Sequence, residues 1–287
     1  MENSYHDFLS WAPLIRAKTS TPMEASWTHR AYLGDRQQQP IPVLCLAGLH
    51  GDQDMYRCVF TSLAPKQYSI YALDLPSIPS LTSVKDFCLC LEAWMSQVKI
   101  ARAHFVGVHL GGYLSQAMAE LRPHCVVSLS LYNSFLSTQH FYKTCGMGGL
   151  SLAWYKPAPL LRNPLLEEVA ALDDISPGIH HVLFDALSQL RHEALYTRVL
   201  LLNIPHSIGQ VRIEPWRIMV VYALDDTLGV PVHAEQMQER YATSRGTRVA
   251  QMRRGGTYPN LVNPGEFVLL LEVHIRNINQ REGEDIL

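Results

Sequence analysis

The interpretation of this chain starts from residues 105–112, which read FVGVHLGG. A β-branched and aromatic run, typical of a buried strand, ends in Gly-x-x-x-Gly and leads directly into residues with helical spacing. Glycines at these places let a strand turn sharply into a helix and hold the central side chain above the end of a sheet. The sequence therefore predicts a strand, an elbow formed by Gly107 and Gly111, and a helix, with His109 at the centre of the elbow.

Composition limits the classes of protein to which the chain can belong. Its 287 residues, 47% of them hydrophobic, are enough for one large core, so we expect a single domain over residues 1–287. The formal net charge of -2 gives no basic surface for nucleic acid. The six cysteines have no paired Cys-x-x-Cys spacing, so we expect a reduced, cytoplasmic protein with no metal and no cofactor. The sequence has no secretory signal and no run of 18 apolar residues.

Apolar periodicity predicts strands that alternate with helices. This order indicates an α/β protein whose mostly parallel, twisted sheet has helices on both faces. The predicted strands are 26–33, 41–46, 68–75, 104–108, 126–131, 217–223 and 247–252. The predicted helices are 83–100, 111–121, 232–241 and 266–278.

The alternation is interrupted between residues 136 and 213. This stretch is rich in Leu, Pro and Gly and has helix-like runs at 164–171 and 181–201. It lies where an α/β-hydrolase carries its cap. We therefore predict an α/β-hydrolase fold with a helical cap insertion at residues 136–213.

Three strand exits must supply a serine-type catalytic triad, because functional groups in open parallel sheets lie beyond the carboxyl ends of the strands. At the first exit, His109 occupies the place of the nucleophilic serine. An imidazole there has no base behind it, and histidine is among the residues enriched at positive φ. We interpret His109 as a structural or binding residue.

The second exit follows the strand 217–223 and holds Asp225 and Asp226 at the place of the triad acid. Spacing favours Asp226, with Asp225 as the alternate acid. Aspartates also commonly cap turns, so both residues can instead be structural. A bond from Asp226 to His109 is a further alternative.

The third exit follows the strand 247–252 and reads RGGTYPNL at residues 254–261. A hydrolase needs histidine after the glycines, because an imidazole can take and return a proton near neutral pH. Thr257 stands at that place, and a hydroxyl cannot act as the general base. The oxyanion donors would be the backbone amides of Leu110, after the elbow, and Leu49, after the strand 41–46.

Several of these blocks together resemble the maspardin family, a divergent and largely non-catalytic branch of the α/β-hydrolase superfamily. The resemblance covers residues 26–278. It is carried by the sequence around residues 43–48 and Asp54, by 105–116, by the exit SLSLYNSF at 128–135 and by GGTYPNL at 255–261. Members of the family already lack histidine at the position of Thr257. This chain differs further, because the best-known members keep serine where it has His109.

The resemblance implies a cytoplasmic protein that binds rather than transforms, and that reaches endosomal and trans-Golgi membranes indirectly through protein partners. We therefore predict a catalytically inactive, pseudoenzyme adaptor whose capped pocket holds a small apolar ligand or is closed by side chains. The alternative is an esterase-like or lipase-like hydrolase, or a lyase, that uses His109 and Asp226 as an acid–base pair. The sequence does not identify the partner, the ligand or the oligomeric state.

Overall fold

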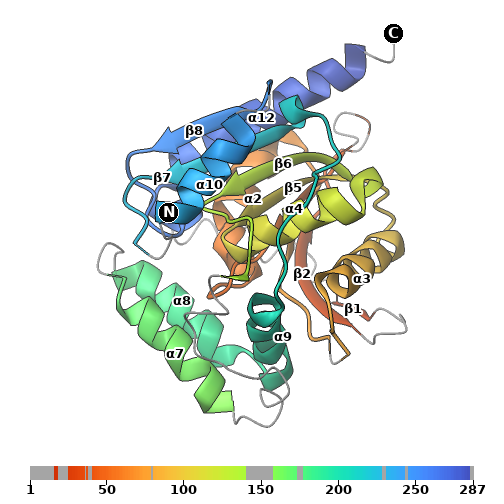
Figure 1. The fold of residues 1–287 in the computed structure, drawn as a ribbon. Coiled ribbons are helices and arrows are strands. Elements are labelled where there is room, and N and C mark those ends of the chain that lie inside the picture. The colour runs from red at the N-terminus through yellow and green to blue at the C-terminus, as the bar shows by residue number, and fades with distance from the viewer. Residues whose placement is uncertain are drawn as a thin grey trace.

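The computed structural model describes residues 16–18, 25–35, 37, 41–78, 80–139, 158–172, 177–227, 231–242 and 245–284. Within these residues, a twisted central sheet lies between two layers of helices, and a separate group of helices lies beside one end of the sheet (Figure 1). Among the described helices, none has the length and apolar character needed to cross a membrane.

The sheet has eight strands in the order β1-β2-β4-β3-β5-β6-β7-β8. The strand β2 pairs antiparallel with β1 and with β4, whereas the pairs from β4 through β3, β5, β6 and β7 to β8 are parallel. All residues of β3, β4, β5 and β6 are buried, as expected for strands that are covered on both faces. The strands are β1 (Arg16–Lys18), β2 (Ser26–Tyr32), β3 (Val43–Leu46), β4 (Ile70–Leu73), β5 (Ala103–Val108), β6 (Val126–Tyr132), β7 (Ile218–Ala223) and β8 (Arg248–Met252).

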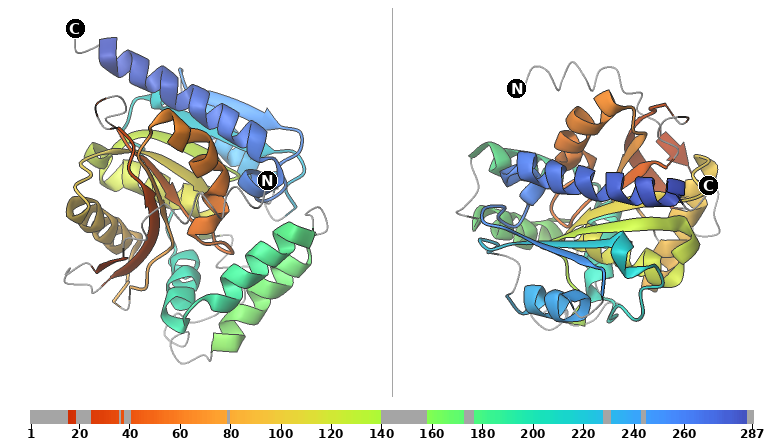
Figure 2. Two further views of the ribbon diagram at one scale, coloured as in Figure 1. Left: turned by 180° about the vertical axis from the view of Figure 1, so that it is seen from behind. Right: turned by 90° about the horizontal axis from the view of Figure 1, so that it is seen from above.

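Helices cover both faces of the sheet (Figure 2). The helices α2 and α12 lie on one face, and α3, α4 and α10 lie on the other. The α-helices are α2 (Arg57–Leu63), α3 (Val84–Gln97), α4 (Leu110–Leu121), α7 (Ala158–Ala170), α8 (Pro177–Gln189), α9 (His192–Asn203), α10 (Pro231–Ala242), α11 (Pro259–Val262) and α12 (Pro264–Glu284). Short 3-10 helices are η1 (Gln53–Tyr56), η2 (Ala64–Lys66), η3 (Pro123–Cys125) and η4 (Pro215–Arg217).

This architecture confirms the predicted mostly parallel α/β sheet with helices on both faces. The start of α3 is also as predicted, because Ser83 and Asp86 form a reciprocal capping box. The sequence interpretation missed the short strand β1, the antiparallel direction of β2, and the helical segment η1–α2. Strand direction is set by pairing between distant segments, and apolar periodicity does not contain that information.

Three helices, α7, α8 and α9, lie between β6 and β7, inside the predicted cap insertion. Residues 140–157 and 173–176 of that insertion lie outside the described residues. The predicted helical run 181–201 is wrong as one element, because it is split between α8 and α9 by Arg191, which has an extended backbone. The prediction that a helix starts at Pro164 is also wrong, since α7 begins at Ala158 and contains this proline.

Three buried histidines contribute a pH-dependent term to stability. Burial lowers the pKa of His29 to about 4, that of His104 to about 3 and that of His274 to about 4. His29 lies among the rings of Tyr71 and Trp94, and among the described residues neither of its ring nitrogens has a hydrogen-bond partner. Protonation of His29 would therefore place an unsolvated cation in an aromatic cluster.

We expect acid to destabilise the fold through His29. The pKa of His29 is about 4 in the folded protein, against 6.5 for an unperturbed histidine. Its contribution to stability is therefore complete above pH 6.5 and is lost as the pH falls toward 4. The variant His29→Phe removes this titration and should lower the difference in unfolding free energy between pH 7 and pH 4 by about 3 kcal/mol. Urea denaturation of both proteins across this range measures the difference, and identical pH profiles would contradict the assignment.

Candidate functional site at the carboxyl ends of the strands

The elbow between β5 and α4 has the strained geometry that its glycines allow. His109 sits at its centre with φ 53° and ψ -118°. A Cβ atom on Gly107 would overlap the backbone of Gly111, and one on Gly111 would overlap the carbonyl oxygen of Leu46 in β3. The two glycines therefore let the start of α4 press directly against the end of the sheet.

His109 is buried, and its ring faces an aromatic neighbour. Its imidazole meets the Phe135 ring edge-on, with centroids 5.3 Å apart, and Phe135 in turn stacks on Tyr113 at 5.0 Å. The Ser134 hydroxyl donates to the carbonyl oxygen of His109 over 3.3 Å. The elbow thus presents an imidazole, packed against a ring, where the fold can present a nucleophilic hydroxyl.

The two aspartates after β7 have different partners. The Thr257 hydroxyl donates to Asp226 Oδ1 over 2.8 Å. Asp225 Oδ1 instead accepts the backbone amides of Gly255 and Gly256, over 2.9 and 2.8 Å. Asp226 therefore faces the side chain at the general-base position, while Asp225 fixes the backbone of the loop that carries it.

Asn133, at the end of β6, completes this arrangement. Its backbone has a positive φ of 43°, its side-chain amide donates to the carbonyl oxygen of Gly256 over 2.7 Å, and its Oδ1 accepts the amide of Ala223 over 2.8 Å. One asparagine thus connects the ends of β6 and β7 to the loop before Thr257. The sequence analysis quoted Asn133 within the family pattern but assigned it no role.

His50, in the loop after β3, joins that loop to α7 and to the Thr257 loop. Its Nε2 lies 2.8 Å from Glu168 Oε2, and its Nδ1 contacts the Tyr258 hydroxyl. An ionised carboxylate can only accept, so the Nε2 proton points to Glu168. Burial raises the pKa of Tyr258, with the charges of Glu168 and Asp226 adding to the shift, so its hydroxyl stays protonated.

Arg198, on α9, makes the most extensive polar contact in this region. Its side chain is 0% exposed, and its Nη1 donates to the carbonyl oxygens of Gly48, Leu49 and Gly51 over 3.3, 2.7 and 2.6 Å. Its Nη2 donates to the carboxylate of Asp74, just beyond β4. Thr197 adds a further link, because its hydroxyl accepts the amide of Ile78 over 3.0 Å.

Burial and neighbouring charges shift the pKa values of the aspartates beside this loop in opposite directions. Burial raises the pKa of Asp74, and the charge of Arg198 opposes that shift. Burial, with repulsion from Asp54 and Asp74, raises the pKa of Asp52 to about 6. The buried guanidinium of Arg198 lowers the pKa values of Asp74 and Asp52, while Arg30 pairs with the third acid, Asp54.

The structure brings two of the three predicted triad positions into direct contact. Thr257 and Asp226 are in contact, and Leu49 and Leu110 are both buried beside the strand ends. The use of the Leu49 and Leu110 amides as oxyanion donors stays a prediction. The missed residues are Arg198, Glu168 and Asn133, each of which acts through a partner far away in the sequence.

The chain has the α/β-hydrolase fold, as comparison with solved structures shows. A thermophilic esterase from Thermogutta terrifontis superposes with a TM-score of 0.72 at 14% identity, over 93% of this chain and 99% of the esterase. A probable hydrolytic enzyme from Pseudomonas aeruginosa superposes with a TM-score of 0.71 at 14% identity, over 92% of this chain and 94% of the other. These comparisons confirm the predicted fold.

Sequence comparison finds maspardins as relatives of this chain. Maspardin from Danio rerio is 25% identical over 281 residues, which cover 96% of this chain and 86% of that protein. Human maspardin is 26% identical over 240 residues, which cover 82% of this chain and 74% of that protein. No family model matches the chain. These matches confirm the resemblance to maspardins that the motifs predicted.

The elbow glycines can be tested by adding one methyl group. Gly111→Ala should destabilise the fold by several kcal/mol or prevent folding, because the new Cβ meets the carbonyl oxygen of Leu46. Gly265→Ala is the matched control, since a Cβ there has nothing within 4 Å and lies in the first turn of α12. Thermal and urea unfolding should show the control unchanged or slightly more stable; equal losses in both variants would contradict the close approach at the elbow.

The buried pair of Arg198 and Asp74 makes a second quantitative test. Arg198→Met leaves Asp74 and three carbonyl groups without their buried donor, so it should cost about 3–5 kcal/mol of unfolding free energy. Arg191→Met removes an exposed arginine at the N-cap of the same helix and should change stability by less than about 0.5 kcal/mol. A loss below 1 kcal/mol for Arg198→Met would refute the assigned role.

Proposed function

We propose that this protein is a hydrolase-fold relative of the maspardins that binds other molecules and does not catalyse hydrolysis. The observation that carries the proposal is the contact between Thr257 and Asp226. In a serine hydrolase the acid holds an imidazole, which accepts the proton of the nucleophile and later returns it. A threonine hydroxyl beside the carboxylate keeps its own proton, so it provides no base near neutral pH.

The elbow supports the same proposal. An acyl-transfer mechanism at this position needs a hydroxyl or thiol that can be activated by a neighbouring base. His109 has neither group, and its ring packs edge-on against Phe135. Replacing single members of a triad typically costs several powers of ten in rate, and two of the three positions differ here.

Contacts between the α7–α9 helices and the strand ends also favour a binding role. Glu168 of α7 holds His50, and Arg198 of α9 holds the loop 48–51 together with Asp74. Buried polar contacts of this kind are strongly destabilising to break from one side. A closed arrangement suits a protein that presents its outer surface to a partner, or that keeps a small apolar ligand under the cap.

The family relationship supplies the cellular part of the proposal. By analogy with maspardins, we place the protein in the cytoplasm, with indirect attachment to endosomal and trans-Golgi membranes through protein partners. The analogy rests on similarity at about 25% identity. The partners can be identified by affinity capture from cytosolic and endosomal fractions. The destabilised variant Arg198→Met serves as the comparison.

A fluorophosphonate probe tests the loss of catalysis. Because the elbow holds His109 and the base position holds Thr257, the purified protein should take up no label and should not hydrolyse short-chain esters. An active esterase of the same fold, treated alongside, is the positive control. Stoichiometric labelling of this chain, or turnover that disappears in His109→Ala, would instead favour the alternative of a rearranged hydrolase.

Restoring the missing groups gives a sharper form of this experiment. The double variant His109→Ser with Thr257→His places the nucleophile and the base in the existing elbow and beside Asp226. We expect labelling above background in the double variant and none in either single variant, because the two groups act as one unit. Labelling of the single variant His109→Ser to the same extent would mean that another residue supplies the base.

A further inference from the structure

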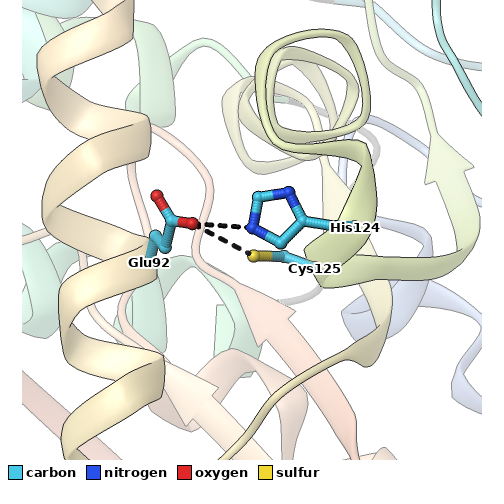
Figure 3. Close-up of side chains that lie close together, drawn as sticks. All are labelled: Glu92, His124 and Cys125. Atoms are coloured by element: carbon cyan, nitrogen blue, oxygen red, sulfur yellow. Dashed lines mark hydrogen bonds and ion pairs between the residues drawn. The ribbon is translucent and has the colours of Figure 1, made fainter.

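A second cluster of reactive side chains lies at the opposite end of the sheet. Glu92 projects from α3 toward His124 and Cys125, which belong to the 3-10 helix η3 directly before β6 (Figure 3). The elbow lies at the carboxyl end of the neighbouring strand β5, whereas Cys125 lies at the amino end of β6. The cluster is therefore separate from the site described above.

The three side chains converge on a small volume. His124 Nε2 lies 2.7 Å from Glu92 Oε1, and Cys125 Sγ lies 3.9 Å from the same oxygen. One potential ligand atom from each residue lies within 4.8 Å of the other two. Among the residues that the structure describes, this is the group of three His, Cys, Asp or Glu side chains that meets this condition.

The donor set suits zinc and related transition-metal ions better than magnesium or calcium. A thiolate, an imidazole and a carboxylate are the three ligand types of zinc sites, whereas magnesium and calcium prefer oxygen ligands alone. An ion with zinc bond lengths and tetrahedral angles keeps its ligand atoms about 3.3–3.8 Å apart. The Glu92–His124 separation would have to widen by about half an ångström, which a 64% exposed histidine side chain allows.

The charges around the cluster are compatible with a divalent ion. A carboxylate and a thiolate together neutralise the ion, with the thiol proton released to solvent. Arg122 binds the other oxygen of Glu92, with Nε 2.9 Å from Oε2, and so leaves Oε1 directed at His124 and Cys125. The exposure of His124 also provides access for the ion and for a water molecule as the fourth ligand.

We propose that Glu92, His124 and Cys125 form a zinc-binding site that fastens α3 to the start of β6. The ion would replace the direct hydrogen bond between Glu92 and His124 with bonds to a common centre. Glu92 and the His124–Cys125 pair are separated by about thirty residues of chain, which include β5 and α4. The ion would therefore link α3 directly to the start of β6.

Cobalt is the appropriate first probe, because it occupies zinc sites and reports thiolate ligation through near-ultraviolet charge-transfer absorption. Untagged protein is stripped with a chelator, kept reduced with a phosphine, and titrated with Co²⁺ and then Zn²⁺. We expect one equivalent of Co²⁺ with a thiolate charge-transfer band, and displacement of the band by Zn²⁺.

Variants assign the ligands. His124→Ala, Cys125→Ser and Glu92→Gln should each weaken binding at least tenfold, and Cys125→Ser should also lack the charge-transfer band. His181→Ala is the matched control for an exposed imidazole beside a carboxylate, since His181 lies 3.3 Å from Asp185 on α8. Cys58→Ser is the control for a thiol, and both controls should bind like the original protein.

Two results would overturn the proposal. One is the absence of a charge-transfer band in the original protein at saturating Co²⁺. The other is unchanged binding in His124→Ala, whose exposed side chain can be removed without disturbing the fold. Metal analysis and thermal unfolding of the same samples provide readouts that do not depend on any activity.

Discussion

The guanidinium of Arg198 is the contact on which the closed arrangement of this protein depends. A guanidinium offers five donors, has no acceptor and stays ionised, so it can be buried only where acceptors and a negative charge surround it. Carbonyl groups at Gly48, Leu49 and Gly51 and the carboxylate of Asp74 provide that surrounding. Because Arg198 belongs to α9, this single side chain fixes a cap-side helix, the loop after β3 and the end of β4 relative to one another. The same loop carries His50, so the contact to Glu168 on α7 depends on the position that Arg198 imposes.

The polar residues at the strand ends make hydrogen bonds that hold the backbone of the neighbouring loops. Asp225 holds two loop amides, Asn133 joins β6, β7 and the same loop, and Asp226 accepts a threonine hydroxyl. Each of these bonds has a fixed donor and a fixed acceptor, whereas catalysis by acid and base needs a group that changes its protonation state during the reaction. These contacts hold the strand ends without any proton transfer, which is consistent with the proposed binding role. A fold alone does not determine function.

Local spacing was enough to predict the strands β2 to β8, the elbow and the residues at the three exits, but not the short strand β1. The pattern around Gly107, His109 and Gly111 acts over a few residues, and so does the position of Thr257 after two glycines. The contacts of Arg198 and of Glu168 could not be predicted in this way, because their partners are 124–150 and 118 residues away. In the sequence, Arg198 stands within an apolar helical run where a long charged side chain usually reaches solvent. The break between α8 and α9 was not predicted either. It matters for the same contacts, because α9 carries Arg198 to the loop after β3.

The helix α4 runs between the elbow and the cluster of Glu92, His124 and Cys125. It begins at the elbow after His109 and ends at Leu121, just before Arg122, which holds Glu92. Coupling between the ends would require this helix to have two positions of similar energy. Its residues from Leu110 to Ala119 are all buried, and Gln116 is fixed by bonds to Phe135 and from Tyr241. A close-packed interior with satisfied polar groups resists sliding. A zinc ion at the proposed site would therefore stabilise the whole fold against unfolding and would not act as a switch for the elbow.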